Sequence, residues 1–114
     1  MTFADFYAAL EPMQAEIVSF IDGYCINECS MLRKMRYRVP FYDKNTWICY
    51  LNRVKNDQLE LCFLEGRLMA DKFPSLDMKN RKKVSGITID PLSDLPLEVM
   101  EMIKFAIRLD DTTS

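Results

Sequence analysis

The sequence contains no histidine. This absence excludes Ser-His-Asp and Cys-His nucleophilic sites, histidine-ligated zinc, and the commonest general base at neutral pH. Glycine is scarce: Gly23, Gly66 and Gly86 are the only three, and they lie too far apart to form a glycine-rich phosphate-binding loop. Without a convincing acid, base or nucleophile, the chain is predicted to be non-catalytic.

Long apolar runs and sorting signals are also missing. No stretch approaches the roughly 20 apolar residues that a membrane helix needs. The first residues, MTFADFYAALEP, lack the basic start, apolar middle and small-residue cleavage site of a secretory signal. We therefore expect a soluble, cytoplasmic protein with no membrane partner.

Four cysteines are present, namely Cys25, Cys29, Cys49 and Cys62. In a cytoplasmic chain with its own hydrophobic core, they are expected to be free thiols. The C-x3-C spacing of the first pair differs from that of a zinc ribbon, although the other two could complete four thiolates. Buried apolar cysteines are therefore preferred over structural zinc or redox chemistry.

What the chain does contain is enough apolar sequence for one core. Its 114 residues are 49% hydrophobic, which predicts a single domain over residues 1–114. The net charge of −2 is unevenly spread, because residues 1–30 carry five acidic and no basic side chains, whereas 31–60 carry seven basic and three acidic ones. The pI of about 5.1 argues against nucleic acid as a partner.

Helical periodicity occurs at both ends of the chain. It predicts a short helix over residues 3–10, an amphipathic helix over 11–26 and a C-terminal helix over 95–109. Ser93 or Asp94 is expected to cap the last of these. The stripe expected to be buried in the second helix comprises Met13, Ile17, Phe20, Ile21 and Tyr24. The corresponding stripe in the C-terminal helix comprises Leu95, Val99, Met102, Ile103 and Ala106.

Between the helices the apolar period falls to two, which is typical of strands. Strands are predicted over residues 31–37, 46–54, 58–66 and 82–90, and a helical turn is possible in the loop between the last two. The short link after residue 54 predicts an antiparallel hairpin. Two irregularities are also expected: a join between two strands at Pro40 and a bulge at Gly86.

This order of elements predicts an α+β fold. Its N-terminal helices and C-terminal helix would pack on one face of an antiparallel meander of about five strands. The other sheet face would be open, or covered by a second copy in a homodimer. Most basic residues lie on the sheet segments, so the open face is expected to be basic.

Aromatic and basic side chains concentrate between Arg36 and Asn52. The alternation places Trp47, Cys49 and Leu51 on one strand face, so only part of the aromatic set can meet a ligand. The residues that we predict to bind a ligand are Tyr42, Trp47, Tyr50 and Arg81.

Carboxylates offer weaker possibilities. Glu11, Glu16 and Asp22 point in different directions on a straight helix, so they form no obvious metal site. Glu98 and Glu101 share a helix face. Lys104 follows Glu101 by three residues, which predicts an ordinary ion pair between these two side chains. A shallow, weak cation site is the alternative.

The middle of the chain resembles the YdhG-like family of small bacterial domains of unknown function. The resemblance is carried by Tyr37-x-x-Pro40-Phe41-Tyr42, by the aromatic strand from Trp47 to Leu51, by Phe63-Leu64-Glu65-Gly66 and by RKKVSGITI before the final helix. Family members often have glycine where this chain has Arg38. The resemblance implies a frataxin-like α+β fold, and one family member is regarded as an iron chaperone for iron–sulfur cluster and haem assembly.

Two hypotheses follow. The resemblance implies an accessory protein that handles weakly bound iron and meets iron–sulfur or haem assembly proteins. The residues themselves suggest a domain that binds a small ligand or a protein partner through the aromatic and basic face of its sheet.

Overall fold

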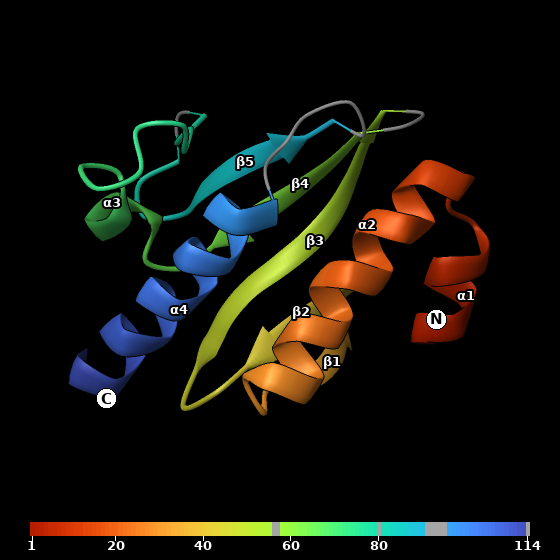
Figure 1. Ribbon diagram of the computed structural model, residues 1–114, viewed down its shortest axis with the longest axis horizontal. Helices are drawn as coiled ribbons and strands as arrows, with labels where there is room; N and C mark the ends of the chain where they lie inside the picture. Colours follow the sequence, from red (N-terminus) through yellow and green to blue (C-terminus); the bar gives the residue numbers. More distant parts are fainter. Residues whose placement is uncertain (56–57, 80, 91–95, 114) are drawn as a thin grey trace.

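A computed structural model describes residues 1–55, 58–79, 81–90 and 96–113. The chain forms four α-helices, one π-helical turn and five strands among these residues (Figure 1). In chain order they are α1 (Phe3–Ala8), α2 (Pro12–Gly23), η1 (Tyr24–Glu28), β1 (Leu32–Arg36), β2 (Val39–Asp43), β3 (Trp47–Lys55), β4 (Gln58–Phe63), α3 (Gly66–Met69), β5 (Ser85–Ile89) and α4 (Pro96–Thr113).

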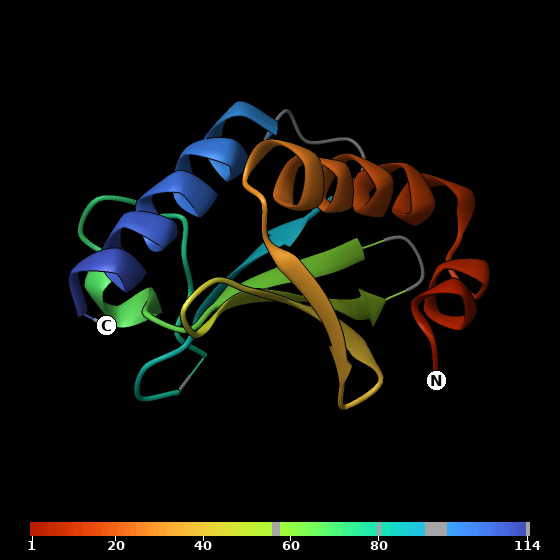
Figure 2. The ribbon, with the colours of Figure 1, turned by 90° about the horizontal axis from the view of Figure 1, so that it is seen from below.

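The five strands form one antiparallel sheet in the order β1-β2-β3-β4-β5. Helices α2 and α4 cover one face of this sheet, and α1 lies beside it (Figure 2). The predicted α+β fold, with a five-stranded antiparallel meander and a C-terminal helix packed on one face, is confirmed. None of the helices in the described ranges combines the length and apolarity that crossing a membrane would require.

The core lies between the sheet and the two long helices. In β4 the predicted alternation holds, because Leu59, Leu61 and Phe63 belong to the main core cluster, whereas the Glu60 side chain reaches Lys79 and Arg81 outside that cluster. In α4 the predicted stripe is also buried at Val99, Met102, Ile103 and Ala106. Leu95 and the predicted caps at 93 and 94 lie outside the described residues.

In helix α2 the predicted stripe is confirmed in part, because Ile21 lies in the core and Ile17 packs against it. Met13 and Phe20, expected in the core, are 44% and 43% exposed, whereas Gln14 and Val18 are fully buried. Gln14 can occupy the buried face because its amide donates to the Gln58 carbonyl at 3.1 Å and its carbonyl oxygen accepts from the Glu11 N–H at 2.9 Å. The polar residue is satisfied by hydrogen bonds that periodicity alone does not reveal.

The chain reversal between β1 and β2 lies before Pro40, not at it. Tyr37 and Arg38 form this turn with φ of 54° and 66°, the left-handed region that glycine adopts freely and other residues adopt rarely. Pro40 is inside β2, opposite Met35, and the register with β3 begins only at Phe41. The predicted join at Pro40 was therefore wrong: Pro40 has one strand neighbour, and its missing N–H is tolerated there.

The predicted bulge at Gly86 was also wrong. β5 begins at Ser85, and Gly86 continues the regular register with β4 opposite Cys62. A Cβ at Gly86 would lie 2.6 Å from a Glu60 carboxylate oxygen, so glycine makes room for a side chain of the neighbouring strand. The glycine within the strand pattern does have a structural cause, but that cause is a close approach between strands and not a bulge.

One irregularity in the sheet register lies at the start of β3, and another lies near its end, between Arg53 and Lys55. Asp43 pairs with Trp47 and Tyr42 pairs with Cys49, so Ile48 is an extra residue in β3. Ile48, Cys49 and Leu51 all belong to the core cluster, while the Trp47 ring contacts Phe41 and Tyr50. The expectation that Trp47 shares a face with Cys49 and Leu51 fails because the bulge rotates Trp47 to the opposite side.

Candidate binding surface on the sheet face opposite the helices

Four aromatic rings form a continuous cluster on the sheet face opposite α2 and α4. Phe41 stacks on Tyr50 with ring centroids 4.8 Å apart, and the Trp47 ring lies 5.2 Å from Phe41 and 5.7 Å from Tyr50. Tyr37, in the β1–β2 turn, extends the cluster at 6.2 Å from Phe41. We call these four residues the aromatic platform.

The platform is graded in exposure. Phe41 is 6% exposed and forms its base, Trp47 and Tyr50 are half-buried, and Tyr37 is 90% exposed. The register explains the cluster, because Phe41 lies directly opposite Tyr50, where cross-strand side chains pack closely. The rings therefore provide a fixed surface whose outer members can still meet another molecule.

Charged residues flank the platform on one side in β1 and β2. Asp43 is 7% exposed and accepts two hydrogen bonds from Arg36, at 2.9 and 2.7 Å, with Lys34 at 3.5 Å. The Arg36 guanidinium also lies 5.3 Å from the centre of the Phe41 ring. The hydrogen bonds from Arg36 hold the pKa of Asp43 below its usual range, so this carboxylate stays charged.

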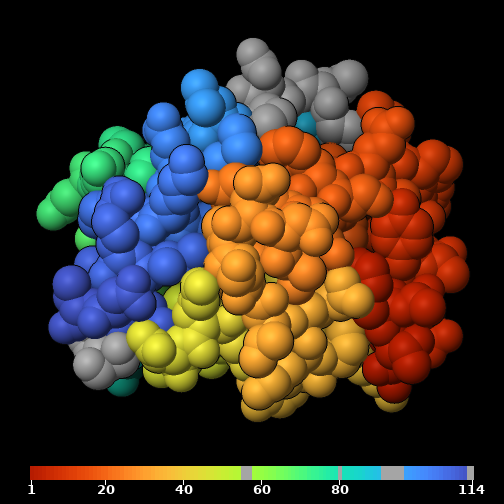
Figure 3. Space-filling model, turned by 60° about the horizontal axis from the view of Figure 1, so that its bottom comes forward, coloured from red at the N-terminus to blue at the C-terminus, as the bar shows by residue number. Residues whose placement is uncertain are grey.

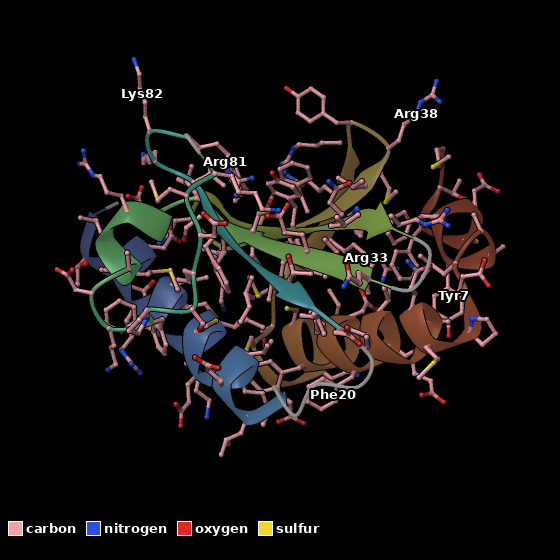
Figure 4. The ribbon with its side chains drawn as sticks, turned by 90° about the horizontal axis from the view of Figure 1, so that it is seen from above. Tyr7, Phe20, Arg33, Arg38, Arg81 and Lys82 are labelled. Carbon is pink, nitrogen blue, oxygen red and sulfur yellow. The ribbon has the colours of Figure 1, made fainter. Side chains whose placement is uncertain are left out.

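A second ion-paired group flanks the platform in β4 and the loop before β5. Glu60 is 5% exposed and meets Lys79 at 2.9 Å and Arg81 at 3.3 Å. Burial opposes its charge, but Lys79, Cys62 and Arg81 outweigh burial and keep the pKa of Glu60 below its usual range. Figure 4 shows Arg81 on the side of the sheet away from the helices.

These ion pairs change the predicted charge of the face. The cations that were expected to make it basic are present, but Arg36, Lys34, Lys79 and Arg81 each pair with a buried carboxylate. The platform is therefore bordered by matched charges and does not present unpaired cations to a ligand at these four positions.

The structure brings together three of the four predicted ligand-binding residues. Trp47 and Tyr50 belong to the platform, and Arg81 lies near Tyr50, whose pKa burial raises to about 12. Tyr42 lies on the opposite face, is fully buried, and donates a hydrogen bond to Asp22 of α2 at 2.7 Å. Its assignment to the ligand site was wrong, because adjacent strand residues point to opposite faces.

Sequence reasoning missed two platform members, Phe41 and Tyr37. Phe41 and Tyr42 are adjacent in one strand, so their side chains point to opposite sheet faces. Because Tyr42 is in the core, Phe41 lies on the same face as Tyr50, and the alternation could have identified it. Tyr37 gives a weaker signal, because its position in the turn depends on an unusual backbone conformation.

The cysteines do not assemble into one site. All four are free thiols, as predicted; Cys25 and Cys49 are buried in the core, Cys62 is buried in β4, and Cys29 is partly exposed after η1. Within the described ranges, no three or more cysteine, aspartate and glutamate residues are grouped so that they could hold a metal ion.

Two concave regions described by the structure lie beside the platform, not over it. One, of about 300 Å³, lies at the tip of the β1–β2 hairpin against α1 and includes Tyr37 and Arg38 in its lining. A much smaller one, of about 10 Å³, lies between Trp47 and α4. Each is lined by one member of the platform, Tyr37 in the first and Trp47 in the second.

Comparison with known proteins identifies the fold but not a function. The chain is similar to a solved structure of a protein from the DUF1801 family, YdhG from Bacillus subtilis, with a TM-score of 0.71 and 16% sequence identity over 97% of this chain and 91% of that one. No family model matches the sequence, and no curated protein matches it either. The similarity supports a YdhG-like architecture.

Proposed function

We propose that this protein is a non-catalytic interaction domain that binds a protein partner through the aromatic platform. The observation that carries the proposal is the stacked cluster of Phe41, Trp47, Tyr50 and Tyr37 on the sheet face that the long helices leave uncovered. Tyrosine, tryptophan and arginine dominate binding energy at protein interfaces, because they combine a large apolar area with a polar group.

The shape of the surface favours a protein over a small molecule. Small-molecule sites are usually concave, with volumes of about 300 to 1,000 Å³. The central rings form no such cavity among the described pockets, and the cleft of about 300 Å³ lies at the hairpin tip. An aromatic surface bordered by neutralised charges fits a partner segment whose contacting side chains are apolar and uncharged, such as proline or aromatic residues.

The turn at Tyr37 and Arg38 adds support. Both residues have positive φ, which costs about 1–3 kcal/mol each for non-glycine residues. The conformation holds Tyr37 away from the sheet, 90% exposed, at the end of the platform. Strain of this kind is commonly retained where a side chain must be displayed for binding.

The proposal is tested by crosslinking and affinity capture from the native cell, using matched variants. We expect a partner to be retained by wild-type protein and by Phe20→Ala, which alters an exposed aromatic residue on the outer side of α2 (Figure 4). Tyr37→Ala and Trp47→Ala should each weaken retention at least about tenfold. Equal retention by all four proteins would refute the proposal.

A second copy of this chain is another possible occupant of the platform. Light scattering over a range of protein concentrations would separate the two cases. If the protein is a dimer and Tyr37→Ala dissociates it, the platform binds a second copy of the chain and not a different protein.

The iron-handling role and the frataxin-like relation have no comparable support in the described residues. They contain no group of three or more metal-ligating side chains, and the ion-paired carboxylates Asp43 and Glu60 are occupied by cationic side chains. The proposal therefore rests on the platform and not on iron.

A further inference from the structure

A third concave site lies within the helical layer. It has a volume of about 500 Å³ and lies between η1, the β2–β3 turn and α4. These three segments meet on the face shown in Figure 3, where the orange, yellow and blue parts of the chain adjoin. Its lining includes Tyr24, Cys29, Lys44, Lys104, Ile107 and Arg108.

The cations of this pocket differ from those around the platform. Lys44, Lys104 and Arg108 form no ion pair with any carboxylate in the described ranges, whereas the platform's cations are matched. In particular, the predicted pairing of Lys104 with Glu101 is not formed. One carboxylate, Glu28, also lines the pocket, so three cations face one anion.

A buried donor adds an independent observation. The Tyr24 hydroxyl is buried and makes no hydrogen bond of normal geometry among the described residues, and the Cys29 thiol of the same pocket lies beside it. Burial raises the pKa of Tyr24 to about 12, so its O–H remains protonated and can donate at neutral pH. A buried polar group without a partner is unusual in a native protein and calls for a missing acceptor.

The local backbone explains how Tyr24 reaches the pocket. Tyr24 begins the π-helical turn, in which the Cys29 N–H bonds the Tyr24 carbonyl at 3.1 Å. Isolated π turns occur frequently at functional sites because the wider turn redirects side chains. Here residues from both ends of the turn, Tyr24 and Glu28, line the same pocket as α4.

We propose that this pocket binds a small phosphate-bearing ligand. Arg108 provides the planar donor group that matches phosphate oxygens, while Lys44 and Lys104 provide compact positive charges. Tyr24 supplies an uncharged donor, and Ile107 offers apolar contact for the carbon portion of the ligand. The site lies on the helical layer, so it is separate from the aromatic platform and from any partner bound there.

Isothermal titration calorimetry with inorganic phosphate and pyrophosphate, at ionic strength matched with chloride, tests the site. Both probes should bind, and Arg108→Gln or Lys104→Gln should weaken binding by about tenfold. Glu28→Gln should strengthen binding several-fold, because it removes the pocket's negative charge. Lys82→Gln, an exposed cation outside the pocket, should leave affinity unchanged.

Alkylation of Cys29 gives a second readout. It is the partly exposed thiol, whereas the other three are buried, so neutral iodoacetamide should modify it first, and bound pyrophosphate should slow that modification. The proposal is overturned if neither probe binds at about 20 mM. It is also overturned if binding is equal in wild type, Arg108→Gln and Glu28→Gln proteins that remain folded.

Discussion

Replacing Tyr42 with phenylalanine separates a structural role from a role in binding. The substitution keeps the buried ring and removes only the hydroxyl, which donates to Asp22 at 2.7 Å. A hydrogen bond to a charged group contributes about 1.5–3 kcal/mol. Asp22 retains two contacts from Arg33, at 2.8 and 2.7 Å, and its side chain is 17% exposed to water, so the lower end of that range applies.

We therefore expect Tyr42→Phe to lower the free energy of unfolding by about 1.5 kcal/mol. For 114 residues the entropy of unfolding is about 240 cal/mol/K near the midpoint, so Tm should fall by about 6 °C. Urea unfolding and calorimetry would measure both values. Tyr37→Phe removes the hydroxyl of a residue that is 90% exposed, so it should change the free energy of unfolding by no more than about 0.5 kcal/mol.

The same variant makes a prediction about alkaline pH. Burial, followed by the bond to Asp22, raises the pKa of Tyr42, so the folded protein keeps this proton while the unfolded chain loses it near pH 10. Stability from Tyr42 is thus present below about pH 10 and lost above it. The difference between wild type and Tyr42→Phe should shrink above about pH 10; a constant difference, or none at pH 7, would refute the reasoning.

Three further predictions concern packing, acid stability and thiol reactivity. Gly86→Ala should destabilise by about 1–3 kcal/mol in urea unfolding because its Cβ meets a carboxylate at 2.6 Å, whereas Gly23→Ala, with no atom nearer than 3.9 Å, should be neutral or stabilising. Stability from Asp43 should be present above about pH 4 and lost as pH falls through its depressed folded pKa, so unfolding measured from pH 7 to 2 should show a smaller loss in Arg36→Gln; equal losses would contradict this. Mass spectrometry should find Cys29 alkylated first in native protein, and earlier modification of any buried cysteine would count against the packing.

Periodicity predicted the fold well where one physical rule controlled a segment. The alternation in β4 and the stripe in α4 are consequences of burial on one side, and both are present in the structure. The rule failed in α2, where hydrogen bonds satisfy the buried Gln14 and Phe20 remains exposed. Hydrophobicity scales cannot anticipate such a pairing, because the partner of Gln14 is 44 residues away.

The candidate site was predictable only in part for a similar reason. One additional residue, Ile48, reverses the faces on either side of it, so strict alternation placed Trp47 with the core. The neutralisation of the basic face also escaped prediction, because Glu60 and Lys79 are 19 positions apart and meet only after the sheet has formed. The local sequence pattern identified the aromatic and basic residues of the site, while tertiary packing determined which of them lie together.

The strand order has a consequence for how the chain folds. Since every strand pairs with its neighbour in sequence, β1 to β4 can form by adding one hairpin at a time, whereas β5 joins after the longer connection between Phe63 and Ser85 closes. The slow step then belongs to the docking of α2 and α4, because Asp22 of α2 and the last turns of α4 must reach a sheet whose strands are already adjacent. A substitution that weakens the packing of α4 against the sheet would therefore slow folding, because those contacts form in the slow step.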